Sequence, residues 1–381
     1  MADIRGPPLN IALIAEQRST YVELGYSEAD CSALPHDGEI KAVFDTLKKL
    51  GHNVTLVLGI QSLVELLAAG KHEEWDLAFN MSQGFHGPAR EAQVPALLEA
   101  YQVTHTFSDA TTMALCQNKA NTKIVLDHHG IPNSPFAVIP ATEQSLNLSN
   151  YDALLPHYPL FVKPVTEGSS KGIETFNKVT EPSELALAVQ KLRARFPGQD
   201  VLVESFLAGR EFTVSILGTG TAGQVIGIRE HIWQPSTSNI SNGNGSNGFQ
   251  SKPDFANRQS KSSNGGEMLK YNDVHDMDDP RIKAACHVAL DAWGAFGCRD
   301  AGRVDLRFDF DDADSVPNVL EVNPIGGLLP GHSPLPACAE QNGISFDRLL
   351  AAIVESALQR KPKNVSPKVS HQHLTSQSLA T

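Results

Sequence analysis

Residues 159–173 read PLFVKPVTEGSSKGI, a short apolar segment that runs into a turn rich in glycine, serine and lysine. Residues 160–162 predict a buried strand, and Lys163 is expected to project from its end, because Pro164 has no N–H to continue the ladder. The turn at residues 167–172 offers unobstructed backbone N–H groups, two hydroxyls and a second lysine, as phosphate-binding loops do. Two interpretations stay open: a lid over a polyphosphate, or a hairpin turn whose glycines only provide positive φ angles.

The composition indicates a globular protein of two or three lobes, with 381 residues of which 41% are hydrophobic. Lys and Arg total 31 against 43 Asp and Glu, and the net charge of -12 argues against a nucleic-acid or anionic-membrane binder. Five scattered cysteines without a CxxC pair favour reduced thiols and a cytoplasmic location. Neither a secretory leader nor a membrane-spanning segment is expected from the apolar runs.

Residues 1–110 predict an N-terminal Rossmann-like domain, because strands are expected at 10–15, 52–58 and 76–80 with helices between them. No strand is followed by GxGxxG, so a dinucleotide is not indicated. The loop at residues 80–91 follows the carboxyl end of the third strand, where open α/β sheets bind ligands. It is therefore either a substrate loop or a plain turn before the next helix.

Residues 111–203 predict a small α+β lobe. One helix is expected at 111–130, with Lys119 either in a cleft or on the surface, and a second at 182–196. Strands are expected near 135–139, 160–162 and 200–204. The short connection after Glu204 is expected to hinge this lobe to a C-terminal lobe at residues 204–360.

The composition of two segments predicts that they are disordered. Residues 234–266 are rich in Ser, Asn and Gly and carry a single aliphatic residue, Ile240, so they cannot bury enough apolar surface to offset their ordering entropy. We interpret them as an insertion in a surface loop. The tail at residues 361–381 is similarly polar.

A second group of polar side chains follows two predicted strands. Residues 303–309 alternate charged and apolar residues, so one sheet face should carry Arg303, Asp305, Arg307 and Asp309. Residues 319–324 place Glu321 and Asn323 on one face in the same way. Adjacent strands would then collect oxygen ligands suited to Mg²⁺, the alternative being a solvated face with cross-strand pairing.

Taken together, these segments resemble the ATP-grasp superfamily and, within it, the D-alanine:D-alanine ligase family. The resemblance extends from about residue 10 to residue 357. It rests on four ordered blocks, at 113–119, 162–170, 204–214 and 302–323. It implies an ATP-grasp fold of mixed α/β and α+β class, in which two lobes clasp ATP beside the Rossmann-like lobe. It also implies an ATP-dependent carboxylate-amine ligase that forms an amide through an acyl phosphate.

The resemblance also implies roles for individual residues. The ATP-binding residues would be Lys119, Lys163, Glu167, Gly168, Ser169, Ser170, Glu204, Phe206, Leu207 and Glu211. Asp305, Glu321 and Asn323 would hold two Mg²⁺ ions, with Mn²⁺ as an alternative metal. Arg303 and the Gly327 amide would stabilise the tetrahedral intermediate, and Lys270 is the best match to a phosphate-binding lysine of a flexible loop.

Departures from the family pattern leave the substrates open. The family holds a substrate ammonium group with a glutamate after the first strand, and here Ala15-Glu16-Gln17-Arg18 leads into an unusual loop. Small-molecule carboxylate and amine substrates, amino acids in particular, are expected, with no nucleic-acid or membrane partner and with a homodimer left open. The alternatives are a ligase for another amino acid or carboxylate, a kinase that releases a phosphorylated product, or a non-catalytic ATP-binding regulator.

Overall fold

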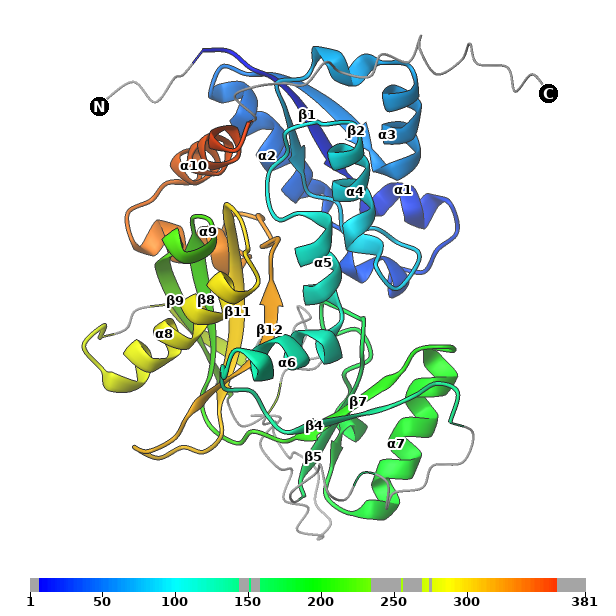
Figure 1. Cartoon of the computed structure of the whole chain (residues 1–381), viewed down its shortest axis with the longest axis vertical. Helices are drawn as coiled ribbons and strands as arrows, with labels where there is room; N and C mark the ends of the chain where they lie inside the picture. The colour runs from blue at the N-terminus through cyan, green and yellow to red at the C-terminus, as the bar shows by residue number, and fades with distance from the viewer. Residues whose placement is uncertain are drawn as a thin grey trace, which may run out of the picture.

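The computed structural model describes residues 7–143, 151, 158–233, 255, 269–273 and 276–361. Apart from Phe255, the predicted insertion lies outside the described residues, and so does the predicted tail beyond Lys361. Within the described part, three sheets stack along the long axis of the molecule (Figure 1). No helix in these ranges is long and apolar enough to cross a membrane.

The first sheet is parallel, in the order β2-β1-β3. Alternation along β1 explains how both faces are covered: Ile11 and Leu13 join one core with α2 and α10, whereas Ala12 and Ile14 join another with α3 and α4. The predicted Rossmann-like arrangement is therefore present. The elements of this part are β1 (Asn10–Ala15), α1 (Arg18–Glu23), η1 (Asp30–Ala33), α2 (Asp37–Lys49), β2 (Asn53–Leu58), α3 (Gly59–Ala68), η2 (Lys71–Glu74), β3 (Leu77–Asn80), η3 (Arg90–Ala92) and α4 (Gln93–Ala100).

The second sheet is antiparallel, in the order β4-β7-β5-β6, with α7 packed on one face. β5 contains the predicted strand of the opening stretch and ends at Pro164, as expected. The elements that lead to and form this lobe are α5 (Ala110–Gln117), α6 (Lys119–His128), β4 (Phe136–Ile139), β5 (Leu160–Pro164), η5 (Thr175–Asn177), β6 (Lys178–Val179), α7 (Pro182–Arg195) and β7 (Val201–Ser205).

The prediction of one helix over residues 111–130 is wrong, because the chain breaks into α5 and α6 at Asn118. Asn118 has φ -91° and ψ 102°, and its side chain accepts a hydrogen bond from the Asn121 N–H, so it caps a new helix. The break frees the Lys119 N–H to donate to the Val165 carbonyl at 3.0 Å. It thereby fixes Lys119 beside the end of β5.

The third sheet is antiparallel, in the order β10-β9-β8-β11-β12, and α8 packs on one of its faces. Asp305 lies opposite Glu321 and Arg303 opposite Asn323, so these four predicted neighbours do share a sheet face. Asp309 does not belong to that row, because β11 ends at Phe308. The elements are β8 (Glu211–Leu217), η6 (Gly220–Ala222), β9 (Gln224–Trp233), β10 (Leu269–Asn272), α8 (Pro280–Ala295), β11 (Ala301–Phe308), β12 (Pro317–Asn323), α9 (Pro334–Gln341) and α10 (Phe346–Gln359).

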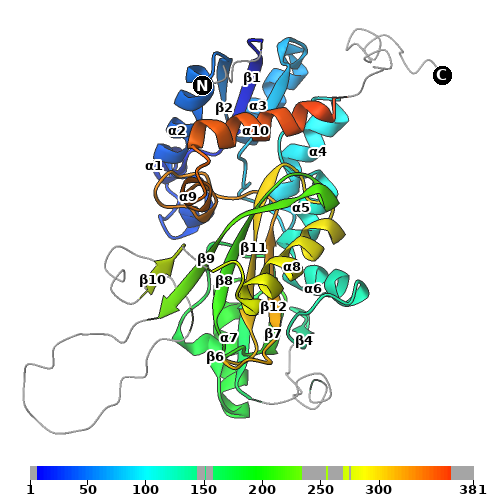
Figure 2. The same cartoon turned by 90° about the vertical axis from the view of Figure 1, so that its left-hand side faces the viewer.

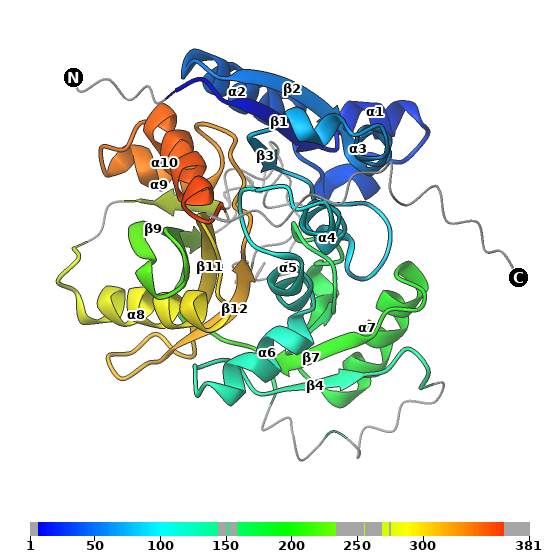
Figure 3. The ribbon, with the colours of Figure 1, turned by 45° about the horizontal axis from the view of Figure 1, so that its top comes forward.

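The last helix returns to the first sheet. Figure 2 shows α10 lying across the molecule beside α2, and Leu350 and Ile353 of α10 share a core with Leu47 of α2. With the top of the molecule turned forward, α4 and α5 lie in the middle of the molecule between the three sheets (Figure 3). The predicted domain bounds remain a prediction, but this packing ties the two ends of the described chain together.

Candidate active site

Two cavities meet where the three parts of the molecule approach one another. The larger has a volume of about 540 Å³ and is lined by the N-terminal part, by the turn at residues 167–172 that was predicted as a lid (the lid turn) and by the third sheet. The smaller has a volume of about 150 Å³ and lies between the second and third sheets. Both are lined by Lys119, Glu167, Ser169, His231, Arg303, Asp305 and Glu321. Groups in one cavity are therefore within reach of groups in the other.

Lys163 lies at the wall of the smaller cavity and is paired with Glu204, whose Oε1 is 2.6 Å from the lysine Nζ. The other carboxylate oxygen of Glu204 is 2.8 Å from the Nζ of Lys123, a side chain that is only 1% exposed. Burial alone would raise the pKa of Glu204, but the two ammonium groups outweigh it and lower that pKa to about 2. This carboxylate therefore stays ionised and fixes both lysines.

Lys119 lies at the junction of the two cavities. Its Nζ donates to the backbone carbonyl of Glu167 and is 3.3 Å from the Glu321 carboxylate. The predicted lid residue Glu167 is itself fixed, because its carboxylate accepts from Gln199 at 2.6 Å and lies 3.4 Å from the Lys171 ammonium. The end of α6, the lid turn and β12 are thus joined by one set of polar contacts.

The lid turn has an unusual backbone. Ser169 and Ser170 have φ angles of 52° and 59°, in the left-handed region that residues other than glycine rarely adopt. Such strain persists only where the surroundings hold it, and it is concentrated at functional loops. Gly168 and Ser169 line the larger cavity, and Ser169 and Ser170 line the smaller one. The turn therefore contributes to the walls of both cavities.

The far end of the smaller cavity is apolar and aromatic. Phe161, Phe206 and Phe255 form a group of rings with centroids 5.1 to 6.4 Å apart. Leu207 lies beside them, and Glu211 lines the same cavity while 3.4 Å from the Arg307 guanidinium. A flat heterocycle could stack here with polar groups at its edge.

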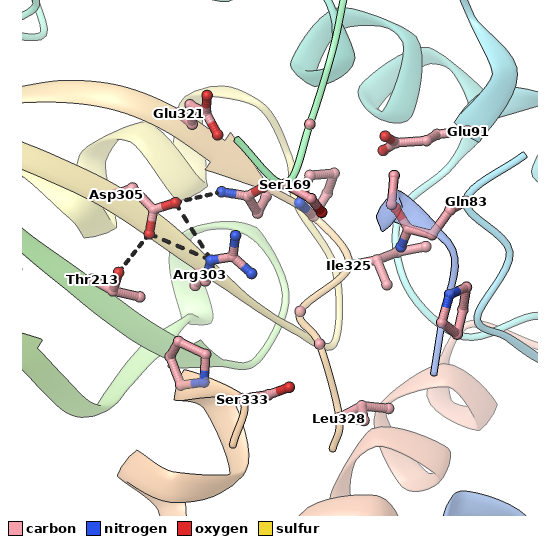
Figure 4. Close-up of a pocket in the computed structure, with 18 of the residues that line it drawn as sticks. Gln83, Glu91, Ser169, Thr213, Arg303, Asp305, Glu321, Ile325, Leu328 and Ser333 are labelled. Atoms are coloured by element: carbon pink, nitrogen blue, oxygen red, sulfur yellow. Dashed lines mark hydrogen bonds and ion pairs between the residues drawn. The ribbon is translucent and has the colours of Figure 1, made fainter. Parts of the chain in front are cut away.

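Asp305 of β11 and Glu321 of β12 line both cavities, and Figure 4 shows them with Arg303 in one pocket. Asp305 accepts hydrogen bonds from the Thr213 hydroxyl at 2.7 Å and from the Asn323 amide at 3.0 Å. The Arg303 Nε is 3.4 Å from both Asp305 oxygens. Since the Asn323 nitrogen is used by Asp305, its amide oxygen remains available as a ligand.

The loop after β12 carries Gly327. A methyl group on Gly327 would lie 2.8 Å from the Ser333 hydroxyl, so a larger residue would require the Ser333 side chain to move. The loop is fixed from the N-terminal part, because the Glu39 carboxylate accepts a hydrogen bond from the Leu328 N–H at 2.6 Å. Burial raises the pKa of Glu39, and the Leu328 contact opposes that shift.

The N-terminal wall of the larger cavity includes Met81, Gln83 and Glu91 from the predicted substrate loop. Burial raises the pKa of Glu91 to about 7, although the nearby Arg90 and Lys119 act in the opposite direction. Glu16 is not in this wall: it is 1% exposed and accepts hydrogen bonds from the Ser82 hydroxyl and the Gln83 N–H.

The structure brings together the predicted ATP-binding and metal-binding residues, with Arg303 and Gly327, along the two cavities, while their roles remain predictions. Lys270 is different. It is exposed on β10 and does not line either cavity within the described residues, whereas the next residue, Tyr271, does. Alternation along the strand sends the two side chains to opposite faces. Sequence reasoning missed Lys123, Glu39 and Glu91, although Lys123 and Glu91 stand in segments that it singled out.

Comparison with known proteins agrees with this geometry. The family model described as "D-ala D-ala ligase C-terminus" matches residues 125–355. A D-alanine–D-alanine ligase of Erythrobacter litoralis is 30% identical over 339 residues, covering 87% of this chain and 90% of its own length. A ligase of the same name from Xanthomonas axonopodis pv. citri is 29% identical over 326 residues, covering 83% and 88%.

Solved structures agree on the fold. The D-alanine–D-alanine ligase of Bacillus anthracis has a TM-score of 0.66 at 20% identity, covering 93% of this chain and 98% of its own, and it has also been solved in complex with ATP. The ligase from Coxiella burnetii has a TM-score of 0.65 at 20% identity, covering 93% and 95%.

The fold and the two joined cavities define an ATP-grasp enzyme, an ATP-dependent ligase. The predicted fold class is thus confirmed. The chain belongs to the D-alanine–D-alanine ligase family.

Proposed function

We propose that the enzyme joins two amino acids by an amide bond and that D-alanine is the first candidate for both, as the names of its relatives indicate. The observation that carries this proposal is the meeting of the two cavities at Lys119, Arg303 and Glu321. ATP would lie in the smaller cavity with its adenine among the phenylalanines. The amino acids would lie in the larger cavity, whose volume of about 540 Å³ also admits side chains larger than methyl.

The proposed reaction has two steps. A carboxylate oxygen of the first amino acid attacks the γ-phosphorus, the bond to the β-phosphate breaks, and ADP leaves. The neutral amine of the second amino acid then attacks the carbonyl carbon of the acyl phosphate, and phosphate leaves as the amine loses a proton. Lys119 and Lys163 would bind the phosphates, while Arg303 and the Gly327 N–H would stabilise the oxyanion.

The residues between the cavities suit Mg²⁺. Within the described residues no cluster of three Asp, Glu, His or Cys side chains forms a complete metal site. Asp305, Glu321 and the Asn323 amide oxygen instead make an incomplete set of hard oxygen ligands, which phosphate oxygens would complete. The metal would neutralise phosphate charge when bound. Mn²⁺ is an alternative to Mg²⁺.

The cellular setting is also a proposal. All five cysteines are buried and unpaired, which supports a reducing, cytoplasmic compartment. A homodimer remains a prediction.

The decisive assay mixes the purified protein with ATP, Mg²⁺ and a panel of D- and L-amino acids, and then measures phosphate release and product mass. A ligase gives a dipeptide and phosphate in equal amounts. A kinase would give a stable phosphorylated product, and a non-catalytic regulator would bind ATP without releasing phosphate. Either of the last two results would contradict the proposal.

Lys163→Met should raise the KM for ATP by about 10- to 150-fold, because a charge-assisted contact to phosphate is removed. The KM for the amino acid should change much less. Lys171→Met is the matched control: that lysine also lines the smaller cavity but is paired with Glu167 within the same turn, and its removal should be several-fold milder. If Lys171→Met strongly raised the KM for ATP while Lys163→Met left it unchanged, the lid would be wrongly placed.

Glu39→Ala should lower kcat by about 10-fold or more and leave the KM for ATP unchanged, because the Gly327 loop loses its charged anchor. Glu39→Gln keeps an oxygen acceptor and should be milder. Steady-state kinetics on both variants check this. A raised KM for the amino acid at unchanged kcat would instead indicate that Glu39 contacts the substrate.

A further inference from the structure

The carboxylates that line the larger cavity differ in whether they have partners. Glu39 accepts a hydrogen bond from Leu328, Glu167 from Gln199, and Glu321 is paired with Lys119. Glu91 is the exception: among the described residues its carboxylate has no hydrogen bond and no ion pair. Three cations act on Glu91 electrostatically, and each contacts other groups: Lys119 contacts Glu167 and Glu321, Arg90 donates to the Thr166 carbonyl at 3.0 Å, and Arg303 lies 3.4 Å from Asp305.

The Glu91 side chain starts from a fixed backbone. Its N–H donates to the Gln117 side chain at 3.2 Å, and the neighbouring Arg90 is buried against the lid segment. Figure 4 shows Glu91 and Gln83 on the side of the cavity away from Arg303 and Asp305. A carboxyl group that lines a cavity and makes no direct ion pair among the described residues favours a cationic ligand, which would stabilise its charged form.

In the family pattern a glutamate after the first strand holds a substrate ammonium group. Glu16, which follows the first strand here, is not placed to bind a ligand. Glu16 is buried, both its oxygens are used by residues 82 and 83, and it does not line either described cavity. Glu16 instead anchors the loop that leads to Glu91.

We propose that Glu91 binds the α-ammonium group of the amino acid whose carboxylate is phosphorylated. This inference rests on the proposed function and assigns a recognition residue within it. The α-ammonium is the one cation that all simple amino acids share. The acceptor amino acid is the poorer match, because its amine must be unprotonated to attack, and an adjacent carboxylate would keep it protonated.

The test isolates the acyl-donor site by trapping the acyl phosphate with hydroxylamine, which attacks the carbonyl carbon in place of the second amino acid and releases phosphate. D-alanine is compared with propionate, which has the same carbon chain without the ammonium group. If the panel selects another amino acid, that amino acid and its desamino analogue are used. Glu91→Gln, Glu91→Asp and the exposed surface control Glu73→Gln are compared with wild type.

Glu91→Gln should raise the KM for D-alanine by about 10- to 100-fold with the KM for ATP unchanged, whereas propionate should be equally poor with both enzymes. Glu91→Asp should recover much of the loss, and Glu73→Gln should match wild type. An unchanged KM for D-alanine would overturn the assignment. A lower kcat at unchanged KM would also overturn it, since that pattern indicates a base for the acceptor amine.

Calorimetric titration of D-alanine with a non-hydrolysable ATP analogue present gives a readout that needs no turnover. Weaker binding by Glu91→Gln with an unchanged melting temperature supports the assignment even in a protein that proves not to be a ligase. A wild-type protein that binds every amino acid of the panel as weakly as the variant does would overturn it.

Discussion

Glu321→Gln should lower turnover by at least about a hundred-fold while nucleotide binding remains measurable. Glu321 lies directly opposite Asp305 on the neighbouring strand, lines both cavities and is 3.3 Å from the Lys119 ammonium. The substitution removes one of the two carboxylates proposed to hold Mg²⁺, and charge stabilisation by a metal is worth several kcal/mol in a transition state. It also removes the partner of Lys119. The shape of the side chain is kept, so the fold should not change.

The measurement is phosphate release as a function of Mg²⁺ concentration, with the binding of a fluorescent ATP analogue measured in parallel. Glu340→Gln on the exposed side of α9 is a matched control for the same chemical change. Near-normal turnover of Glu321→Gln at limiting Mg²⁺ would refute the metal assignment. Loss of nucleotide binding together with turnover would mean that Glu321 mainly positions Lys119.

The alternation of polar and apolar residues was sufficient to predict which side chains share one face of a strand. The alternation of residues 303–307 and 319–323 correctly placed Arg303, Asp305, Glu321 and Asn323 on one face, because side chains on a strand alternate with a period of two and the strands are neighbours. The same logic predicted the strand before Pro164.

Local patterns failed where a side chain competed with the backbone. The apolar positions continue from α5 into α6, so a single helix was expected, but the Asn118 side chain caps the second helix and breaks the first. This error matters for the site, because the break fixes Lys119 beside the lid. In the sequence, Asn118 is not distinguished as a helix cap from the many asparagines that lie on protein surfaces.

The contacts that hold the site residues in place from distant segments were not predicted. The hydrogen bond between Glu39 and Leu328 joins residues 289 positions apart, and the partner of Lys123 comes from β7. The roles inferred from the resemblance cover residues that face the ligands. The resemblance does not identify the supporting residues, such as Glu39 and Lys123, that hold the ligand-facing residues in place. The structure is needed to find them.

Lys123→Met should lower the free energy of unfolding by about 1.5 to 3 kcal/mol, because it removes a buried charge-assisted hydrogen bond while Glu204 keeps Lys163 as a partner. The Lys123 Nζ is 2.8 Å from Glu204, 2.9 Å from the Ser134 hydroxyl and 3.1 Å from the Ser134 carbonyl, in a side chain that is 1% exposed. Methionine has nearly the same length and fills the space, so the loss reports the polar contacts. Lys123 lies outside the described lining of both cavities, so the KM for ATP should change little.

Denaturant unfolding of a double-mutant cycle made of Lys123→Met, Glu204→Gln and the double variant separates pairing from packing. The double variant should be more stable than the sum of the two losses implies, because each single variant already loses the contact between Lys123 and Glu204, which can be lost only once. Additive losses would refute the coupling. Because the pKa of Glu204 falls from its usual 4.5 to about 2 in the folded protein, its stabilising effect is complete above about pH 4.5 and is lost as the pH falls towards 2. The difference in stability between wild type and Lys123→Met should therefore shrink over that range, and a difference that stays constant down to pH 2 would show that the Glu204 carboxylate is not its cause.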